Sequence, residues 1–373
     1  MIHISKRPDF NRFTGEKKKY NRYAGMLIGV GIRLAALLLS LVVSGVVIYA
    51  ITKLNPLKVY AEMVSGSFGT SRRVWVWLRD TALLLVIAVG LAPAFKMRFW
   101  NIGAEGQVLV GALATAACMI YMGSANIPTP LFLIIMAAAS VLAGALWGIV
   151  PAVFKARWGT NETLFTLMMN YIAIQLTNFF IPMWEHPKGS NTVGIINAGT
   201  KAGWFPEIFG QQYLLNVLIV AVISVLMFFY LKRSKHGYEI AVVGQSENTA
   251  RYAAMNVKKI IVRTTTLSGA ICGLGGFLAV AGADHTVSTG TAGGRGFVAI
   301  IVAWLAKFNP IIMALISAML VFLNKGAIAI ASRFNLSNDV SDMIQGIILF
   351  FILGSEFFIN YRVRITRGKE KEA

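Results

Sequence analysis

Long apolar runs separated by short polar segments dominate the pattern of this 373-residue chain. A helix that crosses a membrane needs about 20 mostly apolar residues. By that rule, the chain is predicted to contain spans at 26–51, 81–97, 103–122, 129–153, 163–182, 212–231, 262–282 and 340–360. The region 296–332 holds a short run, 297–306, and a longer run after Asn309-Pro310, which makes two more segments. The pattern predicts an all-α polytopic membrane protein with about ten transmembrane helices.

The composition excludes the other broad classes of protein. Charged residues make up 14% of the chain and hydrophobic residues 56%, whereas a soluble domain has roughly 25% charged residues. Such an apolar chain is not disordered, and two cysteines cannot form a disulfide scaffold. Cys118 and Cys272 both lie inside apolar runs, so they are interpreted as small core residues and not as metal ligands.

The basic residues predict the orientation of the chain in the membrane. The net charge of +19 could indicate nucleic-acid binding, but the basic residues lie at the ends of apolar runs, which favours membrane topology. Placing both termini in the cytoplasm puts 24 of the 35 Lys and Arg residues on the inner side. The resulting organisation is a basic cytoplasmic leader (1–25), a transmembrane domain (26–360) with external loops 52–79 and 183–211 and a cytoplasmic loop 232–261, and a basic cytoplasmic tail (361–373).

Two spans begin with clusters of amides and carboxylates. The residues are Asn101, Glu105 and Gln107 at one start, and Asn161, Glu162 and Asn170 at the other. An ionised carboxylate at the bilayer centre costs about 2.5–3.5 kcal/mol, so it needs a partner or a polar cavity. The side chains either line a translocation path or cap the helix N-termini, where the helix dipole favours a carboxylate.

The inner loop contains a short predicted helix. Ser246 is a good N-cap, and Ala250, Ala253 and Ala254 form a small apolar face. A helix of two turns is not stable alone in water, so it needs a partner. The face suits a groove on another protein, and the alternative is an amphipathic helix on the lipid headgroups.

Other motifs indicate packing and not catalysis. Gly144 and Gly148, like Gly269 and Gly273, are four residues apart and allow two helices to approach closely. The glycine-rich stretch 290–296 predicts a tight external turn into a short helix. The chain has no phosphate-binding loop and no HExxH or CxxC motif, so neither catalytic residues nor a metal site are predicted.

Several of these segments together resemble permease subunits of ABC-type importers for nucleosides and simple sugars, within the branched-chain amino acid/ribose-type permease superfamily. The resemblance covers about 55–360 and rests on Asn101-Ile102-Gly103-Ala104-Glu105-Gly106-Gln107, Gly159-Thr160-Asn161-Glu162-Thr163 with Met169-Asn170-Tyr171, Gly237-Tyr238-Glu239-Ile240 through Arg251-Tyr252-Ala253, Gly294-Arg295-Gly296-Phe297 and Asn309-Pro310. Departures from the usual pattern are Ala241 in place of Arg and Ala254 in place of Gly, and Lys325 is unexpected late in a span.

The resemblance implies a fold, a location and partners. These are a type II-like ABC importer permease in a bacterial plasma membrane, a second and non-identical permease subunit, cytoplasmic ATPases that carry ATP and Mg²⁺, and a lipid-anchored or periplasmic solute-binding protein. No cofactor is expected on this chain. The segment that couples it to the ATPase would include Gly237, Tyr238, Glu239, Gly244, Gln245, Ser246, Ala250, Arg251, Tyr252 and Ala253.

The leading hypothesis is therefore a permease for nucleosides that is driven by a separate ATPase, with simple sugars as the alternative solutes. A different class of protein, an ion-coupled secondary transporter, needs an acidic site inside the membrane. Glu105 and Glu162 are the candidates for such a site. A membrane-embedded enzyme is the third class, and no set of residues in the chain supports it.

Overall fold

The computed structural model describes residues 2–6, 16–125 and 127–365. The chain divides into two compact units, Val74–Val321 and the pair of segments Met1–Arg73 and Phe322–Ala373. The helices are α1 (Glu16–Thr52), α2 (Pro56–Phe68), α3 (Ser71–Lys96), α4 (Ala104–Met122), α5 (Thr129–Trp158), α6 (Glu162–Trp184), α7 (Leu214–Arg233), α8 (Lys235–Gln245), α9 (Glu247–Tyr252), α10 (Val257–Ala279), the π-helix η2 (Val280–Asp284), α11 (Arg295–Leu305), α12 (Pro310–Phe334) and α13 (Asn338–Asn360).

Seven helices in the described part of the chain are long and apolar enough to cross a membrane: α3, α4, α5, α6, α7, α10 continued by η2, and α12. They match seven of the predicted spans, so the chain is a multi-pass membrane protein whose membrane-spanning segments are helical. The other predicted segments correspond to α1, to α13 and to the short helix α11. As expected from Asn309-Pro310, the chain breaks between α11 and α12, where Lys307 and Phe308 have positive φ angles of 50° and 60°.

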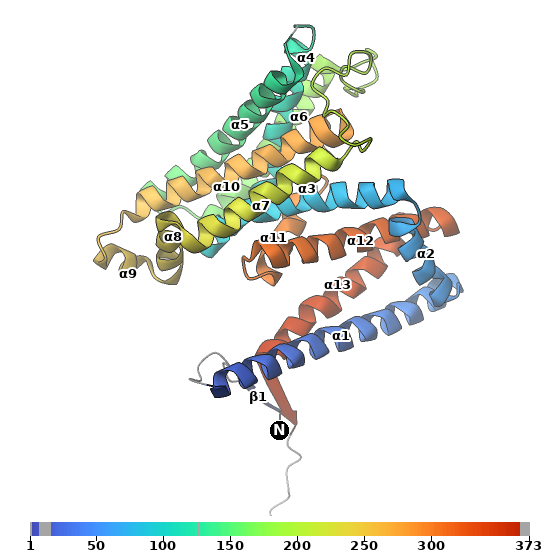
Figure 1. Cartoon of the computed structure of the whole chain (residues 1–373), viewed down its shortest axis with the longest axis vertical. Helices are drawn as coiled ribbons and strands as arrows, with labels where there is room; N and C mark the ends of the chain where they lie inside the picture. The colour runs from blue at the N-terminus through green and yellow to red at the C-terminus, as the bar shows by residue number, and fades with distance from the viewer. Residues whose placement is uncertain (1, 7–15, 126, 366–373) are drawn as a thin grey trace, which may run out of the picture. The chain divides into compact units, whose positions relative to one another are not determined.

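Helix α10 is the centre of the unit Val74–Val321, and α5 runs alongside it (Figure 1). Gly144 of α5 faces Gly269 and Gly273 of α10 so closely that a Cβ atom on Gly144 would overlap their backbone atoms. On another side of α10, Gly111 of α4 meets Gly273 in the same way. The predicted close packing of glycine-bearing helices is therefore confirmed, because only hydrogen side chains fit at these crossings.

The second unit is built around α1, α2, α13 and the end of α12. Helix α1 lies alongside α13 (Figure 1). The chain turns by 108° between Leu38–Thr52 and α2, where the Asn55 side chain accepts a hydrogen bond from Leu57 N–H at 2.9 Å and caps α2. Strand β1 (Ile2–Lys6) pairs antiparallel with β2 (Tyr361–Ile365), a pairing that the sequence analysis did not predict.

The two segments predicted as external loops, 52–79 and 183–211, have different structures. The segment 52–79 was predicted as a loop, but α2 and the first turns of α3 occupy most of it. Helix α2 has 13 residues, too few for the span rule, and it is stabilised by burying Val59 and Met63. The segment 183–211 is irregular, and it packs through the buried side chains of Val193, Ile196 and Phe205.

Candidate translocation core and coupling segment

The start of α4 and the start of α11 meet through Glu105. One carboxylate oxygen of Glu105 accepts a hydrogen bond from Gly294 N–H and the other from Gly296 N–H, both at 2.7 Å. Gly294 has a φ angle of 73° and ends the turn before α11, as the glycine-rich stretch predicts. Glu105 therefore occupies the positive N-terminal end of α11, where a carboxylate satisfies two otherwise free N–H groups.

A second polar group of this core is formed by two amides on the α4 side. Asn101 Nδ2 donates to Gln107 Oε1 at 3.3 Å and to Ser268 Oγ of α10 at 3.2 Å. Asn101 Oδ1 accepts from Gly103 N–H at 3.1 Å. Both amides are buried, with exposed fractions of 0% and 1%. Their hydrogen bonds hold the non-helical segment before α4 against α10.

The buried amide of Asn170 joins α6 to the same segment. Its Oδ1 accepts from Gly106 N–H at 2.8 Å, and its Nδ2 donates to the Ile102 carbonyl at 2.9 Å. Thr166, one turn earlier on α6, accepts from Ile102 N–H at 3.1 Å. The chain is not helical just before α4, so these backbone groups have no partner within a helix. The bonds from α6 satisfy them.

Three of the motifs named from the sequence therefore meet in one place: the segment 101–107, Asn170 and the turn 294–296. The other predicted pair lies at the start of α6. Asn161 caps α6 by accepting from the N–H groups of Thr163 and Leu164, and Glu162 forms an ion pair with Lys155 at 2.7 Å. In this conformation Asn161 and Glu105 accept bonds from N–H groups at helix starts, as the capping interpretation expects. Asn101 and Gln107 bond to each other and Glu162 forms an ion pair, and a role of the six residues in lining a path stays a prediction.

Sequence reasoning missed one ionic group next to this core. Asp80 in α3 is 4% exposed and pairs with Arg79 at 2.9 Å and with Arg295 of α11 at 3.8 Å. The predicted span starts at residue 81, so both charges lie outside it. The sequence does contain a signal that the span starts earlier: Arg79 and Asp80 carry opposite charges, and a neutralised pair can enter a membrane segment.

The predicted coupling segment forms two helices joined at Ser246. The Ser246 side chain accepts from Thr249 N–H at 3.2 Å, so its prediction as the N-cap of a short helix is confirmed. Gly244 of α8 packs against the backbone of Lys96 and Met97 at the end of α3. Gly237 N–H donates to the Ser234 cap at 2.9 Å. Helix α8 is thereby attached to the ends of α3 and α7.

The exposed surface of this segment differs from the predicted one. Ala250 is completely buried, so it cannot share an exposed face with Ala253 and Ala254. The helix is also shorter than predicted, because α9 ends at Tyr252. Tyr238 and Tyr252 are exposed, at 65% and 91%, and the other predicted residues Glu239, Gln245, Arg251 and Ala253 are exposed or half-buried. The surface available to a partner is formed by these side chains around the end of α9.

Ala254 follows α9 in a left-handed conformation, with a φ angle of 56°. That conformation costs a residue with a Cβ atom about 1–2 kcal/mol relative to its ordinary conformations, whereas glycine adopts it freely. We expect Ala254→Gly to stabilise the turn locally by about 1 kcal/mol, seen as slower hydrogen exchange over residues 247–256. Ala253→Gly is the matched control, because Ala253 has an ordinary φ of −81°. Equal exchange rates in the two variants would contradict this explanation.

Comparison with known proteins identifies the family of the chain. The family described as the branched-chain amino acid transport system permease component matches residues 74–353. The chain belongs to this family. The permease is 31% identical to the guanosine ABC transporter permease protein NupP of Bacillus subtilis, over 93% of this chain and 96% of that protein.

Two other relatives are named for glucose and for nucleosides. The permease is 27% identical to the glucose ABC transporter permease protein TsgB13 of Haloferax volcanii, with 93% of each chain covered. It is 25% identical to the nucleoside ABC transporter permease protein NupB of Lactococcus lactis, over 80% of this chain and 84% of that protein. No solved structure matches the chain.

Proposed function

We propose that this chain is the membrane-spanning subunit of an ATP-driven importer that carries nucleosides. The observation that supports this solute class most strongly is the full-length similarity to the guanosine permease NupP. The similarity to the glucose permease TsgB13 keeps simple sugars as the second candidate. ATP binding and hydrolysis would take place on a separate cytoplasmic ATPase, and a solute-binding protein would deliver the solute from outside.

The proposal includes ten membrane crossings with both termini in the cytoplasm of a bacterial cell. Residues 285–305 would provide one crossing as an irregular segment followed by α11. In support, α11 begins beside Glu105 and ends with Trp304 stacked on Trp100, at a ring-centroid distance of 5.2 Å. Because Trp100 follows α3, the chain leaves α11 at the end of the molecule where α8 contacts α3.

The mechanism follows from how the core and the coupling segment are attached to each other. Helices α8 and α9 lead directly into α10, and α10 contacts both α5 and α4 through glycines. A displacement of α8 and α9 by the ATPase would therefore move α10 relative to the segment 101–107. The polar groups around Glu105 and Asn170 would then exchange partners and open the path.

Uptake measurements test the solute class. Cells in which this chain is deleted should lose uptake of radiolabelled guanosine or another nucleoside while glucose uptake is unchanged, and the gene should restore it. Loss of glucose uptake alone would assign the chain to sugars. In wild-type cells, depleting ATP while an ion gradient is maintained should abolish nucleoside uptake, whereas persistent uptake would favour an ion-coupled transporter.

A substitution at the end of α9 tests the coupling segment. Ala253 is exposed, so Ala253→Glu should leave the fold intact. A buried unpaired charge costs several kcal/mol at an interface, and we expect at least about ten-fold less ATPase to co-purify, with uptake falling in parallel. Ala125→Glu, at an exposed position after α4, is the control. Normal ATPase recovery with Ala253→Glu would count against docking at this segment.

A further inference from the structure

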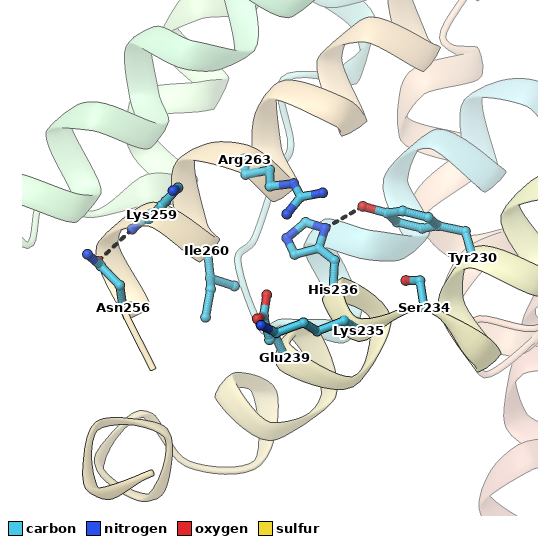
Figure 2. A pocket seen from close by; sticks show the side chains of 9 residues that line it. All are labelled: Tyr230, Ser234, Lys235, His236, Glu239, Asn256, Lys259, Ile260 and Arg263. Atoms are coloured by element: carbon cyan, nitrogen blue, oxygen red, sulfur yellow. Dashed lines mark hydrogen bonds between the residues drawn. The ribbon is translucent and has the colours of Figure 1, made fainter. Parts of the chain in front are cut away.

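A cavity of about 420 Å³ lies where the end of α7, the start of α8 and the start of α10 converge (Figure 2). Its nine lining residues are Tyr230, Ser234, Lys235, His236, Glu239, Asn256, Lys259, Ile260 and Arg263. It is separate from the polar core around Glu105, and of the predicted coupling residues it contains only Glu239. The transport function described above leaves this cavity unused.

The cavity carries an excess of positive charge. Three cations, Lys235, Lys259 and Arg263, line it against a single carboxylate, Glu239. Within the described part of the chain, none of the three cations forms an ion pair within 4.0 Å. Cations without a counter-ion around a shared space attract an anion from outside the chain.

Two helix ends add to this potential. Ser234 caps α8 by accepting from Gly237 N–H at 2.9 Å, and Asn256 caps α10 by accepting from Lys259 N–H at 3.1 Å. Both caps line the cavity, so the positive ends of two helix dipoles adjoin it. An anion at this place interacts favourably with both helix ends and with all three cations.

His236 forms an uncharged part of the wall. Its Nδ1 is hydrogen-bonded to the Tyr230 hydroxyl and its Nε2 lies 3.2 Å from Thr264 Oγ1. Burial lowers the pKa of His236, and the charge of Arg263 lowers it further. The ring is therefore neutral near pH 7, and a bound anion depends on the Lys and Arg side chains for its counter-charge.

The surroundings of the cavity indicate where the anion comes from. Helix α7 leads to it with an exposed apolar surface that includes Val222, Val225, Leu226 and Phe229. At the end of this surface, Lys232 lies 4.0 Å from the Phe228 ring centroid and Arg233 lies 5.3 Å from that of Phe229. Lys and Arg side chains at the end of an apolar helix surface place their charges at the level of the lipid headgroups.

We propose that this cavity binds the phosphate group of an anionic phospholipid from the cytoplasmic leaflet, beside the segment that docks the ATPase. The assignment to that leaflet rests on the orientation given under Proposed function, and the anion chemistry rests on the cavity alone. Cytoplasmic leaflets carry anionic lipids, and basic pockets between helices bind their headgroups. A headgroup here would hold the ends of α7, α8 and α10 together.

Lipid retention by the purified full-length protein tests the proposal. The protein is equilibrated in mild detergent with dioleoylphosphatidylglycerol or with dioleoylphosphatidylcholine, and bound lipid is counted by native mass spectrometry. We expect preferential retention of phosphatidylglycerol. Arg263→Gln and Lys259→Gln should each weaken it about five-fold, the effect of one basic residue at a membrane surface. Glu239→Gln should strengthen retention, because it removes the only carboxylate among the residues described as lining the cavity.

Lys258→Gln is the matched control, since Lys258 is an exposed neighbour on α10 that does not line the cavity. Equal retention in Arg263→Gln, Lys259→Gln and Lys258→Gln would overturn the proposal. So would variants that lose the ATPase while they keep the lipid, which would assign the cations to the partner protein. A further arm adds sodium phosphate to lipid-free protein. If phosphatidylglycerol is not retained preferentially while phosphate gives saturable thermal stabilisation that is lost in Arg263→Gln, the cavity is assigned to free phosphate and the lipid source is overturned.

These outcomes are independent of the transport assay. Lipid retention is measured without solute, so a failure of nucleoside uptake leaves the result for this cavity unchanged. Thermal unfolding of each variant, followed in the same detergent, identifies one that loses lipid because it is misfolded. The opposite effect expected for Glu239→Gln provides a second check, because a damaged fold does not retain more lipid.

Discussion

Replacing Glu105 by glutamine should reduce uptake more than any other single change in the polar core. Both carboxylate oxygens accept backbone N–H bonds at the start of α11. Glutamine keeps the shape of the side chain, but it removes the charge and turns one acceptor into a donor that faces an N–H group. A buried N–H without an acceptor costs about 1–3 kcal/mol, and hydrogen bonds to charged groups are the stronger ones.

We therefore expect Glu105→Gln to lower uptake by roughly ten- to a hundred-fold, with a lower unfolding temperature of the detergent-solubilised protein. Glu207→Gln is the matched control, because Glu207 is an exposed acid in the irregular segment 183–211. The amount of each variant in the membrane is measured by quantitative immunoblotting. Wild-type uptake and stability in Glu105→Gln would show that the carboxylate does not hold α11 in place.

Adding one methyl group to Gly144 should prevent the central helices from packing. A Cβ atom at this position would lie 2.7 Å from the Gly273 Cα atom and would also overlap the Gly269 carbonyl oxygen. These are backbone atoms of α10, so no side chain can rotate away to make room. Overpacking of this kind usually costs about 1–3 kcal/mol, and more where the neighbour is rigid.

Gly144→Ala should therefore yield little folded protein in the membrane, or a protein that aggregates during size-exclusion chromatography. Gly346→Ala is the control. Gly346 lies in α13, and a methyl group there would meet no atom of the described residues within 4 Å, so the change should be neutral or stabilise its helix by about 0.5–1 kcal/mol. Normal yield and a normal unfolding temperature for Gly144→Ala would contradict the close crossing of α5 and α10.

The features that were predicted correctly depend on local sequence. Apolar runs long enough to cross a membrane gave the position of most helices, and Asn309-Pro310 gave the break before α12. The Ser246 cap and the short helix after it also follow from neighbouring residues. Such features need no knowledge of the tertiary structure, because the same few residues determine them.

The features that were missed depend on contacts between distant segments. Glu105 and the N–H groups that bind it are about 190 residues apart, so sequence alone left capping and path lining as equal alternatives. Ala250 is buried only because α8 and α10 cover α9. The ion pair between Asp80 and Arg295 was also missed, because it joins α3 to α11.

The departures from the family pattern have different explanations. Ala254 occupies a left-handed position that favours glycine, so the substitution there carries a local cost. Ala241 lies in α8 and is half-buried, and nothing in the structure explains it. Lys325 is half-buried in α12. The helix continues beyond it to Phe334, so the lysine lies inside the helix and not at its end.

Reconstitution tests most directly whether this chain transports only when a separate motor drives it. The purified chain is placed in liposomes that contain ATP, without and then with its ATPase, partner permease and binding protein, and radiolabelled guanosine uptake against a gradient is followed. Accumulation is expected only in the complete assembly and only while ATP is hydrolysed. Uphill accumulation by the chain alone would contradict the account.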